Sequence, residues 1–161
     1  MFKTTDAGEH WETIMDAGQN GVFPVVAIDP VTPTTLYAVA SLSGLAFDAC
    51  SYVSFPKPCS ASSTVFKSVD GGVHRAAVPV GEGLVNTLAI DPLVPATLYA
   101  GTSGGGVLKS IDGGMHWGAI NTGLTDLAVN TLAIDPTWNT VYAGTYHGLF
   151  DLWPRELPVC G

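Results

Sequence analysis

Apolar residues along this chain come in short runs that end at turn signals. In the best-preserved stretch, four such runs predict strands at approximately residues 84–91, 97–102, 106–111 and 115–120, separated by Asp-Pro or Gly-rich segments. An amphipathic helix would need apolar residues at i, i+3, i+4 and i+7 over about a dozen positions, and the runs end sooner. The first two strands are apolar on both faces, which is typical of strands sandwiched between sheets. The pattern predicts an all-β fold of stacked sheets.

Two sequence elements recur along the chain. The tetrapeptide Ala-Ile-Asp-Pro occupies residues 27–30, 89–92 and 133–136, and each copy precedes a Tyr-Ala pair. The tyrosines of these pairs are Tyr37, Tyr99 and Tyr142. The second element, which we call the Asp–Gly hairpin, covers residues 2–11, 66–75 and 108–117.

The spacing of these elements indicates a four-stranded repeat. The hairpin aspartates give 112 − 70 = 42 residues and the Asp-Pro aspartates give 135 − 91 = 44, which suits a propeller blade of about 40–50 residues. The interval from Asp29 to Asp91 is 62 residues, so about 20 extra residues are expected there. Its Ser, Gly, Pro and Cys content predicts an inserted loop at 41–63.

The residue types of the Asp–Gly hairpin suit a tight turn between a third and a fourth strand. The Asp can accept N–H bonds within its own turn, the Gly supplies a positive φ, and the Ser or Thr adds a second local hydrogen bond. The Trp is expected to begin the last strand and to place its ring in the gap beside the next sheet. Arg75 stands where the other two hairpins have Trp. The residues given structural roles are Thr4, Asp6, Gly8, Trp11, Ser68, Asp70, Gly72, Ser110, Asp112, Gly114 and Trp117.

These hairpins resemble the Asp-box, or BNR, repeats of sialidases, sortilin-type receptors, xyloglucan-cleaving glycosidases and photosystem II assembly propellers. The resemblance covers most of the chain and implies an all-β propeller of four-stranded antiparallel blades, with about three blades in residues 1–161. One blade is expected at 22–80 and another at 84–121, while 1–20 and 128–153 are expected to be complementary half-blades. Closed propellers mostly have four to eight blades. Two explanations therefore stay open: the chain is part of a larger propeller, or copies form a homo-oligomer that completes the ring.

Charge and hydropathy narrow the range of expected partners and locations. Six Lys and Arg against fourteen Asp and Glu give a net charge of −8, so nucleic acid is not an expected partner. The most apolar segment, Leu36 to Phe47, is shorter than the roughly 20 residues of a membrane span. Residues 1–6 have no basic segment followed by an apolar one, so no signal peptide is expected in the chain as given. An extracytoplasmic location is nevertheless favoured.

The cysteines and histidines predict no metal site. Cys50 and Cys59 bracket a short segment with two prolines, and either they form a disulfide that pins it or all three cysteines, with Cys160, are ordinary thiols. The histidines that recur before the Trp or Arg are His10, His74 and His116. They are expected on a solvated face of the outermost strand, too far apart to share one ion. No cofactor is expected.

The sequence favours binding over catalysis. Arg75 and Arg155 are the only arginines, too few for the arginine cluster that sialidases use, and no carboxylate pair is recognisable as that of a glycosidase. A non-catalytic module that binds a protein or a glycan is the leading hypothesis. The expected binding surface comprises residues 103–106, 146–148 and the inserted loop, with Tyr52, Phe55, Tyr146 and His147 as candidate contacts. The alternative is part of a larger glycoside hydrolase whose catalytic residues lie elsewhere.

Overall fold

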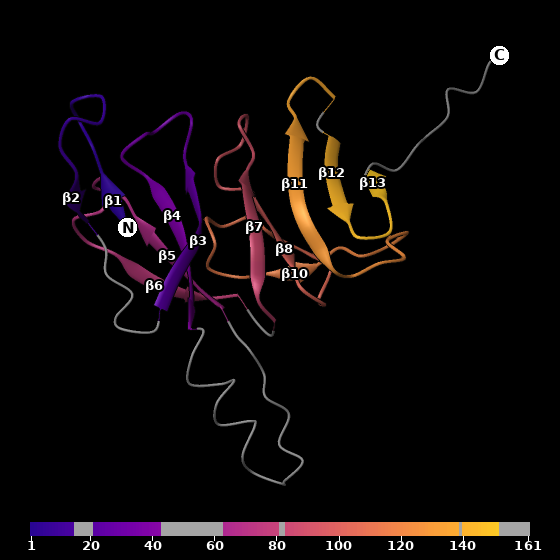
Figure 1. Cartoon of the computed structure of the whole chain (residues 1–161). Helices are drawn as coiled ribbons and strands as arrows, with labels where there is room; N and C mark the ends of the chain where they lie inside the picture. The colour runs from indigo at the N-terminus through magenta and orange to yellow at the C-terminus, as the bar shows by residue number, and fades with distance from the viewer. Residues whose placement is uncertain (15–20, 43–62, 81–82, 139, 152–161) are drawn as a thin grey trace, which may run out of the picture.

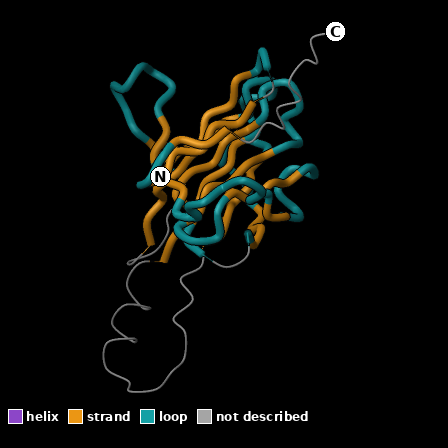
Figure 2. Tube along the Cα trace, turned by 90° about the vertical axis from the view of Figure 1, so that its right-hand side faces the viewer, coloured by secondary structure: helices purple, strands orange, loops and turns teal. Residues whose placement is uncertain are grey.

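A computed structural model describes residues 1–14, 21–42, 63–80, 83–138 and 140–151. Within these ranges every regular element is a β-strand. The sheets stand side by side in chain order (Figure 1). Seen from the side, the strands of the stack share one general direction, and the loops gather at their ends (Figure 2). In these same ranges, no helix is long and apolar enough to cross a membrane.

Four antiparallel sheets make up the stack, and in each sheet the strands pair in chain order. Sheet 1 contains β1 (Phe2–Lys3) and β2 (Glu12–Thr13). Sheet 2 contains β3 (Gly21–Ile28), β4 (Leu36–Leu42), β5 (Ser63–Ser68) and β6 (Ala76–Pro79). Sheet 3 contains β7 (Val85–Ile90), β8 (Leu98–Thr102), β9 (Val107–Ser110) and β10 (Gly118–Ala119). Sheet 4 contains β11 (Val129–Asp135), β12 (Thr140–Thr145) and β13 (Leu149–Asp151). The prediction of an all-β fold with four-stranded antiparallel sheets is confirmed.

The strand register repeats from sheet to sheet. The tyrosine of the second strand lies opposite an alanine of the first strand and a residue of the third. The three sets are Ala27–Tyr37–Lys67, Ala89–Tyr99–Lys109 and Ala133–Tyr142–Asp151. The third-strand residue that lies opposite the tyrosine is thus lysine in sheets 2 and 3 and aspartate in sheet 4.

The core lies between sheets. One cluster joins sheets 2 and 3, with Tyr37 and Val65 packed against Leu98. A second joins sheets 3 and 4, with Tyr99 packed against Val141. All of β8 is buried, as expected for a strand covered on both faces. Apolar burial between sheets therefore holds the stack together.

The fourth strand of sheet 3 begins later than the sequence predicts, at Gly118. The Asp112 carboxylate accepts the His116 N–H at 2.9 Å, so the chain stays in the turn as far as His116. Trp117 then precedes the strand, half-buried, and packs on the core between sheets 2 and 3. The expected direction of the ring was wrong: it covers the preceding sheet, not the next one.

The two incomplete sheets lie at opposite ends of the stack (Figure 1). Sheet 1 lies beside sheet 2, where the Ile14 side chain approaches Gly72. Sheet 4 packs on sheet 3. Among the described strands, none of sheet 1 pairs with one of sheet 4.

The residues at the two ends of the expected insertion belong to strands β4 and β5. Ser41 lies opposite Ser63, and their hydroxyl oxygens are 3.0 Å apart. Residues 43–62 lie outside the described part of the chain, and with them lie Tyr52, Phe55, Cys50 and Cys59.

Candidate functional site

The stack has two rims. The hairpin rim carries the β3–β4, β7–β8 and β11–β12 turns, seen at the top of Figure 1, together with the Asp–Gly hairpins. The loop rim lies at the other ends of the strands and carries residues 103–106, 121–128 and 145–148. The polar residues of the hairpin rim recur at the spacing of the repeat.

A buried hydroxyl organises each Asp–Gly hairpin. Ser110 Oγ donates to Asp112 Oδ1 at 2.8 Å and accepts the Gly114 N–H at 2.9 Å. Ser110 is almost fully buried, and so is its counterpart Ser68. In the first hairpin, Thr4 forms the same pair of bonds. The Ser or Thr therefore links the start of the turn to its glycine.

The hairpin aspartate closes the turn from the other side. Asp112 accepts the His116 backbone N–H, and its Oδ2 lies 2.6 Å from His116 Nδ1. The histidine N–H, followed by its ring and the Ser110 hydroxyl, holds the pKa of Asp112 well below its usual range. In the first hairpin, the His10 N–H followed by the Thr4 hydroxyl lowers the pKa of Asp6 to about 2. These aspartates remain ionised because local donors favour the charged form.

The recurring histidines thus have a local partner. His10 and His116 both face the aspartate four residues earlier, and His74 does the same with Asp70. We expected these histidines on a solvated face of the outermost strand, and that expectation did not include their contact with the aspartate. The sequence signal for it was the constant Asp-x-x-x-His spacing.

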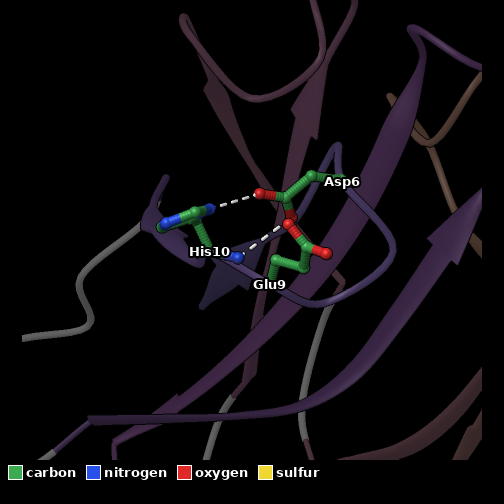
Figure 3. A group of neighbouring side chains, drawn as sticks. All are labelled: Asp6, Glu9 and His10. Carbon is green, nitrogen blue, oxygen red and sulfur yellow. Dashed lines mark hydrogen bonds and ion pairs between the residues drawn. The ribbon is translucent and has the colours of Figure 1, made fainter.

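In the first hairpin, a third residue that could bind a metal ion lies beside the Asp–His pair. Asp6, Glu9 and His10 have ligand atoms within 4.8 Å of one another (Figure 3). Valine and methionine stand at the position of Glu9 in the other two hairpins, which keep the same Asp–His contact. The contact therefore belongs to the turn, and Glu9 is an exposed addition to it.

Two consecutive residues with positive φ complete the turn. They are Gly113 and Gly114 in the third hairpin, with φ of 70° and 92°. The first hairpin has Ala7 and Gly8, and Ala7 has a φ of 59°. A side chain at such a φ is strained, so Ala7 departs from the best residue for its position.

The turn also joins neighbouring sheets. The Gly113 carbonyl of sheet 3 accepts hydrogen bonds from Tyr37 Oη and Lys67 Nζ of sheet 2, both at 3.3 Å. The Lys67 ammonium lies 5.4 Å from the centre of the Tyr37 ring. A groove of about 270 Å³ opens beside this contact, lined by residues of both sheets that include Asp29 and Asp112. The hairpin is therefore an inter-sheet contact as well as a turn.

The Asp-Pro turns on the same rim bind their own backbone. Asp29 accepts the N–H groups of Val31 and Thr32, and Asp91 accepts those of Leu93 and Val94. Asp135 makes the equivalent bonds to residues 137 and 138. One carboxylate oxygen of each of these recurring aspartates, Oδ1, accepts the hydrogen bonds of the turn that the aspartate begins.

The loop rim brings two of the candidate contact residues beside a neighbouring connection. Tyr146 is 80% exposed. His147 Nδ1 lies 2.8 Å from Asp126 Oδ2, in the connection between β10 and β11. Asp126 also accepts the Ala128 N–H, and this bond followed by the His147 contact lowers its pKa. The sequence did not indicate Asp126 as part of this site, because its partner lies 21 residues away.

Backbone hydrogen bonds link the β10–β11 connection to the loop at residues 103–106. Ser103 forms a β-bridge with Ala128, and the Gly106 N–H donates to the Leu127 carbonyl at 3.0 Å. The turn before β13 is held by the Thr145 N–H, which donates to the Gly148 carbonyl at 2.9 Å. Residues 103–106, 121–128 and 145–148 consequently form one connected surface.

Comparison with known proteins gives the fold. No family model matches the sequence, and no curated protein matches it. Among solved structures, the chain is similar to the GH74 enzyme of Niastella koreensis, with 22% identity and a TM-score of 0.65 over 89% of this chain and 23% of that one. It is also similar to the GH74 xyloglucanase from Xanthomonas campestris, with 17% identity and a TM-score of 0.57 over 80% of this chain and 22% of that one. YCF48 bound to D1 peptide is similar with 16% identity and a TM-score of 0.58, over 96% of this chain and 45% of that one.

These similarities establish that the chain has the fold of part of a β-propeller. The chain spans less than half the length of each of these proteins. At such identities the likeness concerns the fold alone, because one fold supports many functions.

Proposed function

We propose that this chain is a non-catalytic binding module that takes a short peptide segment at its loop rim. The observation that carries the proposal is the exposed ring of Tyr146 beside the Asp126–His147 pair. An aromatic ring on a turn held by hydrogen bonds offers a large contact area at a small cost in conformational entropy.

The chemistry of this surface suits a peptide. Tyr146 can pack on an apolar side chain, while the polar groups of the adjacent loops can pair with a peptide backbone. The net charge of −8 favours neutral or basic peptides, because like charges disfavour association.

One of the similar structures supports this choice of ligand class. YCF48 is described there as bound to a D1 peptide, and its similarity extends over 96% of this chain. The same fold therefore has a precedent for peptide binding.

The test is a screen of short peptides against the chain and matched variants. Tyr146→Ala and His147→Ala should weaken the binding of any peptide selected. Trp138→Ala is the control, because Trp138 is also a largely exposed aromatic residue and lies on the hairpin rim. Equal affinity of Tyr146→Ala and the unaltered chain would place the binding surface elsewhere. Selection of oligosaccharides but no peptides would change the ligand class to a glycan.

The alternative function is part of a larger glycoside hydrolase, which the similarity to two GH74 enzymes favours. Under this alternative, the catalytic carboxylates lie outside these 161 residues, and the chain supplies blades of the scaffold. The isolated chain is expected to release no sugar from xyloglucan. Hydrolysis that disappears on replacing one carboxylate of this chain would overturn the proposal of a non-catalytic module.

A further inference from the structure

The groove between sheets 2 and 3 is lined by two polar side chains that are more than nine-tenths buried. Asp29 is 7% exposed and Thr35 is 9% exposed, and both belong to the wall formed by sheet 2. The opposite wall comes from sheet 3 and includes Asp112 and Gly113 of its Asp–Gly hairpin. Both sheets have four strands, so the groove lies between two complete sheets of the stack.

Asp29 uses only one of its carboxylate oxygens in its own turn. Oδ1 accepts the Val31 N–H at 2.8 Å and the Thr32 N–H at 3.0 Å, whereas Oδ2 accepts no hydrogen bond from any described residue. Within the described ranges, no buried side-chain nitrogen or oxygen lacks a hydrogen bond, so Oδ2 is reached by solvent. Since Asp29 lines the groove, this oxygen is an ionic acceptor that a ligand in the groove can reach.

Thr35 offers a second unused oxygen beside Asp29. Its N–H donates to the Thr32 carbonyl at 2.8 Å, and its carbonyl accepts the Asp29 N–H at 3.0 Å. Its hydroxyl forms no hydrogen bond with another described residue and, by the same reasoning, is reached by solvent. A hydroxyl can accept a hydrogen bond as well as donate one. The groove therefore contains two adjacent acceptors on residues that the turn holds in place.

The charges around the groove favour a cationic ligand. Asp29 and Asp112 contribute two carboxylates, and Lys67 contributes one ammonium. The ammonium is already in contact with the Gly113 carbonyl at 3.3 Å and with the Tyr37 ring. The remaining excess of negative charge has the same sign as the net charge of −8 of the whole chain, and both attract a cation.

The size and the apolar wall of the groove suit one long side chain. Its volume of about 270 Å³ is below the range of about 300–1,000 Å³ that drug-sized ligands occupy. Val69 and Pro95 add apolar surface to the walls, and Val69 is 64% exposed. Such surface packs well on the methylene groups of an arginine or a lysine.

Arginine fits the two acceptors better than lysine does. A guanidinium carries five N–H donors in one rigid plane, so a single group can donate to two neighbouring oxygens at once. It also gives up water more easily than an ammonium, which matters beside residues as buried as Asp29 and Thr35.

We propose that this groove binds an arginine side chain of a partner protein. The guanidinium donates to Asp29 Oδ2 and to the Thr35 hydroxyl, and the methylene groups of the arginine pack on Val69. The site lies on the hairpin rim, at the other ends of the strands from Tyr146 and His147. It is therefore a second binding site, separate from the peptide surface of the loop rim.

Titration of the ¹⁵N-labelled chain with the capped tripeptide acetyl-Gly-Arg-Gly-amide tests the site by NMR. The amide signals of Thr35 and Gly113 should shift and reach saturation. The same tripeptide with citrulline in place of arginine has a similar shape and no charge, and its dissociation constant should be about 10-fold higher or more, because it loses the charge-assisted hydrogen bonds. Shifts that do not saturate, or equal binding of the two tripeptides, would overturn the proposal.

Matched variants locate the binding site. Asp29→Asn keeps an oxygen for the turn N–H groups and removes the charge, so it should raise the dissociation constant of the arginine tripeptide by about 10-fold or more. Asp91→Asn is the control, because Asp91 makes the same turn bonds and is as buried as Asp29 but does not line this groove. Equal affinities of the two variants would contradict the assignment.

Two further variants keep the test independent of the stability of Asp29→Asn and of the loop rim. Lys67→Met removes a like charge from the groove and should lower the dissociation constant of the arginine tripeptide; a higher value would show that the groove attracts anions and would contradict the proposal. Tyr146→Ala should leave this constant unchanged, whereas it weakens peptide binding at the loop rim. A loss of arginine binding in Tyr146→Ala would assign the tripeptide to the loop rim and overturn the second site.

Discussion

Replacing Ser110 by alanine removes the hydroxyl that organises the third Asp–Gly hairpin. Ser110 Oγ is the partner of the Gly114 N–H at 2.9 Å and donates to Asp112 at 2.8 Å. Both Ser110 and Gly114 are buried, so alanine leaves a buried N–H without its acceptor. Such a group costs about 1–3 kcal/mol. Ser110→Ala should therefore lower the free energy of unfolding by about that amount.

Urea unfolding followed by tryptophan fluorescence measures this change. Thr125→Ala is the matched control, because Thr125 is exposed and its hydroxyl makes no hydrogen bond within the described residues. The control should lie within about 0.5 kcal/mol of the unaltered chain. If Ser110→Ala and Thr125→Ala unfold at the same urea concentration, the hydroxyl does not have the structural role that its contacts indicate.

Three further changes test other contacts of the hairpin rim. Tyr37→Phe removes one of the two donors to the Gly113 carbonyl and should cost about 0.5–1.5 kcal/mol in urea unfolding; an unchanged midpoint would show that Lys67 alone satisfies that carbonyl. Ala7→Gly relieves a positive φ and should stabilise the first hairpin by about 0.5–1 kcal/mol, seen as slower amide hydrogen exchange; faster exchange would contradict the strain. The pKa of Asp6 is lowered from 3.8 to about 2, so its stabilising contribution is complete above pH 4 and is lost as the pH falls towards 2. Thermal melting across that range should show a smaller acid-induced loss for Asp6→Asn, and equal losses would argue against the carboxylate's role.

The repeat made most of the fold predictable from the sequence. Alternating turn signals and the recurrence of Ala-Ile-Asp-Pro placed the first three strands of sheet 3 within about one residue of their observed bounds, because both signals are local. The fourth strand was the exception. The strand begins only after His116, because the Asp112 carboxylate accepts the His116 N–H and so extends the turn. The residue types alone do not predict this hydrogen bond.

Contacts between repeats were harder to predict. The lysine of the third strand recurs in sheets 2 and 3 and the tyrosine recurs in each second strand, yet the meeting of Tyr37 and Lys67 at Gly113 depends on how the sheets stack. The same limit applies to the loop rim. Exposed Tyr146 could be chosen from its loop position, whereas the partner of His147 comes from another sheet connection. Residues that act across repeats carry no fixed spacing in the sequence.

A double-mutant cycle between Ser110 and Lys67 tests whether the hairpins hold neighbouring sheets together. Ser110 shapes the turn of sheet 3, and Lys67 of sheet 2 reaches the Gly113 carbonyl of that turn. If the hairpin is an inter-sheet contact, the losses from Ser110→Ala and Lys67→Met should fail to add by about 0.5–3 kcal/mol in urea unfolding. Losses that add within about 0.3 kcal/mol would show that the turn stabilises only its own sheet and would contradict the account.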